Sequence, residues 1–229
     1  MIEANFRYPV IVHYWLLSFA LVLLWFPRPW FRFGAKVVSL SSRKPVDKNL
    51  RDSNDASLQL MDELPNPRNW VDLFRALAGG IAVMMFCFER VRGAPKGTAE
   101  IIFIIQCAIL VIALFVQTTR NFQQRVTLVA PIFFIFGLSF GLIGWQAALF
   151  ACVTIWVVNL LLPSAGIFLM VFAVLEVVFA KLLARGFHAH TRTLILAAML
   201  TFIPVLLSAM MNRRLVKLNK KTRVRSAKA

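Results

Sequence analysis

Long apolar runs, separated by short polar segments, dominate the pattern of this 229-residue chain. An α-helix rises about 1.5 Å per residue, so about 20 apolar residues cross the roughly 30 Å hydrocarbon core of a bilayer. We predict transmembrane helices in the runs near that length: Pro9–Phe26, Val71–Phe88, Ala99–Thr118, two within Val126–Leu162, Ala165–Ala184 and Thr193–Met211. The pattern therefore predicts an all-α integral membrane protein, a polytopic helical bundle of about seven transmembrane helices, with six as the alternative.

The 37-residue block Val126–Leu162 is too long for one span. It divides at Gly141–Trp145, where two glycines and an interfacial aromatic residue suit a tight hairpin tip. Because the two halves are short, a re-entrant pair is a second interpretation of this block. Gly137 and Gly141 also have the GxxxG spacing, which allows two helices to approach closely.

The composition supports a membrane protein. Hydrophobic residues make up 59% of the chain and its mean hydropathy is +0.72, more apolar surface than a soluble domain can bury. One membrane domain over 1–229 accounts for the whole length. The formal charge is +16. In a membrane protein a large positive charge first indicates topology, because Lys and Arg stay on the cytoplasmic side. Nucleic acid is therefore not an expected partner.

Two segments hold most of the basic residues. The connection 27–69 has eight Lys and Arg and an amphipathic start, and the tail 212–229 has eight bases and no acid. The positive-inside rule therefore predicts a cytoplasmic connection and C-terminus, with the N-terminus outside, in a bacterial plasma membrane. We expect the tail to contact anionic lipid or a partner subunit through its basic residues. Those residues are Arg213, Arg214, Lys217, Lys220, Lys221, Arg223 and Arg225.

The main candidate site is Glu176, the last acidic residue of the chain, inside the apolar run Ala165–Ala184. An ionised side chain near the middle of a bilayer costs at least about 2.5–3.5 kcal/mol. At 1.5 Å per residue, Gln106, Thr154 and Thr201 fall at a similar depth in their own predicted helices. The functional hypothesis is a site for a proton or cation among these residues. The alternative is that Glu176 is neutral and joins neighbouring helices by hydrogen bonds.

Asp72 and Arg75 are i, i+3 neighbours at the inner end of the second predicted helix. This spacing predicts a local ion pair, with a substrate gate as the alternative. His188 and His190 lack further ligands nearby in sequence, and the three cysteines form no metal-binding motif. We therefore predict no metal and no cofactor.

The segment LPNPRNWVDLFRALAGG resembles the helix opening of CDP-alcohol phosphatidyltransferases. The chemistry of that family needs clustered aspartates downstream to hold metal ions. No aspartate follows Asp72 in this chain, so the resemblance does not extend to that activity. Walker and HExxH motifs are also missing from the sequence, which disfavours an enzyme.

Two function classes remain. The small size and the missing catalytic motifs favour a non-catalytic accessory or assembly subunit of a larger membrane complex. The alternative is a small proton- or cation-coupled transporter that uses Glu176. The first predicts stoichiometric membrane partners, and the second predicts activity in liposomes without them.

Overall fold

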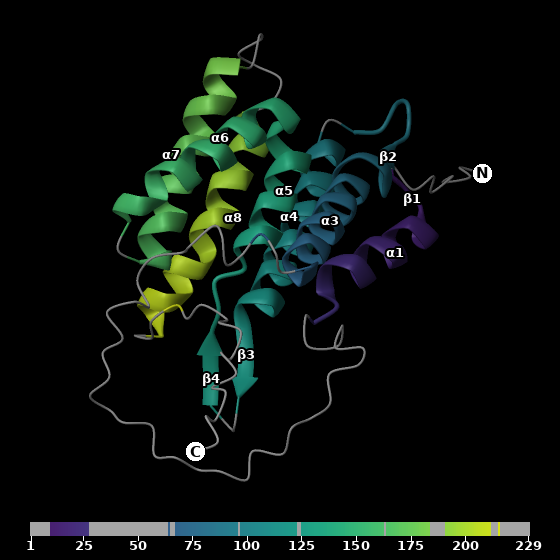
Figure 1. Ribbon diagram of the computed structural model, residues 1–229. Helices are drawn as coiled ribbons and strands as arrows, with labels where there is room; N and C mark the ends of the chain where they lie inside the picture. Colours follow the sequence, from purple (N-terminus) through teal and green to yellow (C-terminus); the bar gives the residue numbers. More distant parts are fainter. Residues whose placement is uncertain are drawn as a thin grey trace, which may run out of the picture.

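The computed structural model describes residues 10–27, 64, 67–95, 97–122, 125–162, 164–183, 191–211 and 215. An all-α architecture is confirmed, with two small antiparallel sheets added at its ends (Figure 1). The α-helices over the described ranges are α1 (Tyr14–Trp25), α3 (Pro67–Ile81), α4 (Thr98–Thr118), α5 (Ile132–Ile143), α6 (Trp145–Val158), α7 (Ala165–Leu183) and α8 (Thr191–Met210).

Four of these helical segments are long and apolar enough to cross a membrane. They are Pro67–Phe86, Thr98–Thr118, Ala165–Leu183 and Thr191–Met210. The other three apolar helices, α1, α5 and α6, have 12, 12 and 14 residues. The long apolar helices are therefore compatible with a membrane location.

The first apolar run does not form one helix from Pro9. It begins as β1 (Val10–Val12), which pairs with β2 (Phe88–Arg90) so that Val12 lies opposite Phe88. The β-branched residues of VIV favour extended backbone, and α1 begins only at Tyr14. The apolar pattern located this segment correctly, but its first part is a strand.

The second apolar run also changes conformation before its end. Helix α3 begins at Pro67, the first helical position where a proline is tolerated. It passes directly into a π-helix at Ala82–Phe86, and the chain then enters β2. A π-helix has wider turns, which leave backbone carbonyl groups in need of other donors.

The second sheet is a hairpin between α4 and α5. Its strands are β3 (Thr119–Phe122) and β4 (Arg125–Leu128), with Thr119 opposite Leu128. Figure 1 shows this hairpin projecting from one end of the bundle. It includes the polar loop between the third and fourth predicted apolar runs and also residues 126–128, so the predicted fourth run begins as a strand and its helix α5 starts only at Ile132.

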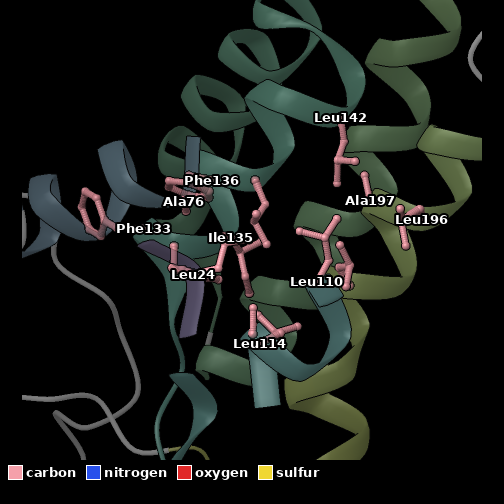
Figure 2. Packing of buried hydrophobic residues seen from close by; sticks show 14 of the residues in the cluster. Leu24, Ala76, Leu110, Leu114, Phe133, Ile135, Phe136, Leu142, Leu196 and Ala197 are labelled. Atoms are coloured by element: carbon pink, nitrogen blue, oxygen red, sulfur yellow. The ribbon is translucent and has the colours of Figure 1, made fainter. Parts of the chain in front are cut away.

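Helix α5 is the central element. Every residue from Ile132 to Ser139 is buried, because α3, α6, α7 and α8 pack against this short helix (Figure 1). Its side chains form the middle of the largest apolar cluster, where Ile135 lies among side chains of α1, α4 and α8 (Figure 2). The α5–α6 turn falls at Gly144, which has a φ of 86° and lies inside the predicted hairpin tip.

Most of the polar connection 27–69 and of the basic tail 212–229 lies outside the described residues, as do His188 and His190. The predicted lipid or partner contacts of the tail also lie outside them. Those residues are Arg213, Arg214, Lys217, Lys220, Lys221, Arg223 and Arg225.

Candidate functional site

Glu176 lies on α7 with none of its surface exposed. Its two carboxyl oxygens contact hydroxyl groups of two other helices. Thr201 Oγ1 on α8 donates to Oε2 at 2.8 Å, and Ser139 Oγ on α5 hydrogen-bonds Oε1. The carboxyl therefore joins α5, α7 and α8 in the interior of the bundle.

Helical periodicity explains why Glu176 points inward. Leu169, Phe172, Ala173 and Ala180 are buried on the same side of α7, at the three- and four-residue spacing of one helix face. Glu176 belongs to this series, so packing of the apolar face brings the carboxyl into the core. Thr201 occupies the corresponding buried face of α8.

Ser139 is the partner that the depth argument missed. It lies between Gly137 and Gly141, and a step of two residues turns about 200° around a helix. Both glycines pack against α3, so Ser139 points to the opposite side of α5, where Glu176 lies. This rotation was the available signal in the sequence, because it places the Ser139 side chain on the face of α5 opposite the close contact of the two glycines.

The surroundings of the carboxyl are uncharged among the described residues. Lys181, on the same helix, is exposed, and no described cation pairs with Glu176. The neighbouring titratable group from α6 is the buried Cys152 thiol. Glu176 is therefore stabilised by hydrogen bonds with hydroxyl groups rather than by an ion pair.

Gln106 and Thr154 have other surroundings. Gln106 is buried on α4, and its Nε2 donates to the carbonyl oxygens of Val83 at 2.9 Å and Met84 at 3.2 Å. The amide thus satisfies carbonyl groups of the π-helix. Thr154 is half-buried on α6 and has no side-chain hydrogen bond among the described residues. Of the three residues predicted at the depth of Glu176, only Thr201 bonds to it.

Asp72 and Arg75 form a buried ion pair with an Nη2–Oδ1 distance of 2.9 Å. Arg75 also donates to Gln117 Oε1 on α4 at 2.6 Å and to the carbonyl oxygen of Phe26 at 2.5 Å. The guanidinium carbon lies 5.3 Å from the centroid of the Phe134 ring, within range of a cation–π interaction.

Gln117 completes this second polar cluster. Its Nε2 donates to the carbonyl oxygens of Leu24 at 3.0 Å and Phe26 at 3.1 Å. The last carbonyl groups of a helix have no partner within the helix and carry its negative dipole end. Arg75 and Gln117 therefore cap the C-terminus of α1 and fix it against α3 and α4.

A histidine–carboxylate contact and a further ion pair lie at the opposite end of the bundle. His13 Nε2 is 3.7 Å from Glu89 Oε2, and Arg192 on α8 is 3.5 Å from Glu100 on α4. All four side chains are at least partly exposed, so such pairs contribute little to stability. In the described part of the chain there is no group of three or more His, Cys, Asp or Glu side chains that could hold a metal ion.

Comparisons with known protein families, curated proteins and solved structures find no match to this chain.

Proposed function

We propose that this chain is a multi-pass membrane protein with seven spans, an outer N-terminus and a cytoplasmic C-terminus in a bacterial plasma membrane. Four long apolar helices and three shorter ones support this proposal. The concentration of Lys and Arg in the connection 27–69 and the tail 212–229 supports the orientation. In this topology the tail lies at the inner surface, where each base gains about 1 kcal/mol from anionic lipid.

We further propose that it is a non-catalytic accessory or assembly subunit of a larger membrane complex. The observation that carries this proposal is how its buried polar groups are used. Glu176, Arg75, Gln106 and Gln117 each bond to a neighbouring helix, as polar residues do when they hold membrane helices together. Through these hydrogen bonds the buried polar groups take part in helix packing rather than lining an open substrate site.

Purification under native conditions tests the subunit proposal. The chain is tagged at its chromosomal locus, extracted in a mild detergent and analysed with the proteins that co-elute. We expect membrane proteins in fixed stoichiometry, and a fall in the level of this chain when the gene of such a partner is deleted. An unrelated multi-pass protein with the same tag is the control. A stable, partner-free chain whose level no such deletion changes would contradict the proposal.

The alternative function is proton- or cation-coupled transport through Glu176. One observation favours it: the carboxyl is at the contact of three helices, α5, α7 and α8, where a change in protonation can alter their packing. The purified chain in liposomes should then conduct protons, and Glu176→Gln should abolish the flux. Equal flux in the two proteins, or flux no higher than in empty liposomes, excludes this transport function.

A further inference from the structure

We infer that the Glu176 carboxyl is a proton-binding site whose acid proton lies on Oε1 and is donated to Ser139 Oγ. The single proton of the serine hydroxyl determines the direction of these hydrogen bonds. Ser139 Oγ is 2.9 Å from the carbonyl oxygen of Ile135 and also bonds Glu176 Oε1. A carbonyl oxygen can only accept, so the serine proton goes to Ile135. The bond to Glu176 then needs a proton from the carboxyl.

The second oxygen of the carboxyl agrees with this assignment. Thr201 Oγ1 donates to Oε2 at 2.8 Å, so Oε2 acts as the carbonyl oxygen of a neutral acid. The bonds then run in one direction, from Thr201 to Glu176, from Glu176 to Ser139, and from Ser139 to Ile135. Each hydroxyl in this series donates once, and both oxygens of the acid have a partner.

The charge around the site also favours the neutral acid. The elements packed against α7 contribute Ser139 from α5, Cys152 from α6 and Thr201 from α8. No described cation among them can balance a carboxylate, and Lys181 on α7 is exposed. An unpaired charge in such an interior is far more costly than a hydrogen-bonded neutral group.

The same geometry distinguishes a proton from a metal cation. Ca²⁺ and Mg²⁺ take about six or more oxygen ligands. Glu176, Ser139 and Thr201 together offer only four side-chain oxygens, and both hydroxyl protons are already directed to acceptors. This inference goes beyond the subunit proposal and does not depend on it, because the bonds lie within one chain.

Infrared spectroscopy of the purified full chain in lipid nanodiscs tests the assignment. At pH 7 we expect the C=O stretch of a protonated carboxylic acid, which is lost in Glu176→Gln. The amide of Gln has one donor and one acceptor end, so it can replace both bonds of the neutral acid and keep the fold. In Thr201→Val the same band should move to higher wavenumber, because its C=O loses a hydrogen-bond donor.

Thr154→Val is the matched control, since it makes the same change on α6 at a side chain that does not contact the carboxyl, and it should leave the band unchanged. A wild-type spectrum with carboxylate bands alone at pH 7 overturns the inference. So does an acid band that remains in Glu176→Gln. If Glu176→Gln does not fold, the Thr201→Val spectrum decides: a shifted band supports the inference and an unshifted band overturns it.

Thermal unfolding of the same samples gives an independent readout. If the folded chain holds the proton and the unfolded chain releases it, wild-type stability falls as the pH rises above the usual range of a carboxyl group. Glu176→Gln should lack this part of the pH dependence. Replacing choline chloride with NaCl or CaCl₂ should not change the wild-type unfolding temperature. A cation-dependent rise that Glu176→Gln abolishes would assign the site to a metal cation and overturn the inference.

Discussion

Gly137 of α5 lies directly against the backbone of Leu73 on α3. A Cβ atom at position 137 would be 2.2 Å from the carbonyl oxygen of Leu73 and 2.8 Å from Cβ of Ala76. Such distances are far below van der Waals contact, so only glycine allows this approach. Membrane helices associate through close packing of this kind, because apolar side chains gain no hydrophobic free energy by moving from lipid into a helix contact.

Gly137→Ala should therefore separate α5 from α3 and lower the free energy of unfolding by about 1–3 kcal/mol, the usual cost of overpacking. Denaturant unfolding in detergent micelles measures the loss. Gly166→Ala on α7 is the matched control, because a Cβ there meets only Ser164 Oγ at 4.0 Å. Equal stability of the two variants would show that the α3–α5 contact tolerates a side chain at 137.

Arg75→Leu should destabilise the chain strongly, by about 3–5 kcal/mol, because it removes the guanidinium that forms an ion pair with the buried Asp72 carboxylate. Removing both charges, in Asp72→Leu with Arg75→Leu, should cost less than the sum of the two single variants. A double-mutant cycle from denaturant unfolding measures this coupling. Additive losses would mean that Arg75 acts through contacts other than its ion pair with Asp72.

Gln106→Leu should destabilise the π-helix. The change removes the donor that satisfies the carbonyl groups of Val83 and Met84, and a buried acceptor without a partner costs about 1–3 kcal/mol. Gln146→Leu makes the same chemical change at an exposed position of α6 and should have little effect. Unfolding free energies of the two variants that agree within error would exclude a structural role for the Gln106 amide.

The apolar pattern was sufficient to locate the helices because an apolar run of bilayer-spanning length rarely indicates any other structure. It was less informative about their ends. The strand at Val10–Val12 forms because a distant strand, Phe88–Arg90, pairs with it. The π-helix at Ala82–Phe86 likewise coincides with a donor from another helix, Gln106. Both features depend on neighbours that a single run of residues does not reveal.

The candidate site shows the same limit. Depth along a helix follows from counting residues, and the residues predicted at the depth of Glu176 include Thr201, which hydrogen-bonds its carboxyl. Depth says nothing of rotation about the helix axis or of which helices are adjacent. Gln106 has a suitable depth but bonds to the π-helix, and Thr154 has a suitable depth but is only half-buried and makes no hydrogen bond to Glu176. Ser139 was recoverable only from its position opposite the glycine face of α5.

The number of spans depends on α5 and α6, whose 12 and 14 residues extend about 18 and 21 Å, short of a bilayer core of roughly 30 Å. If both helices cross the membrane, the exposed Trp145 at their turn lies at the outer surface. A membrane-impermeant maleimide should then label Trp145→Cys in intact cells.

Ser164→Cys supplies the matched control for this labelling. Ser164 is exposed at the start of α7, on the side that the seven-span topology assigns to the cytoplasm. It should react only after the membrane is permeabilised, and the unmodified chain gives the background from its own three cysteines. Strong labelling of Trp145→Cys before permeabilisation supports two crossing helices. If Trp145→Cys reacts neither before nor after permeabilisation while Ser164→Cys reacts after it, α5 and α6 form a re-entrant pair, because a tip that ends inside the bilayer is protected from both sides.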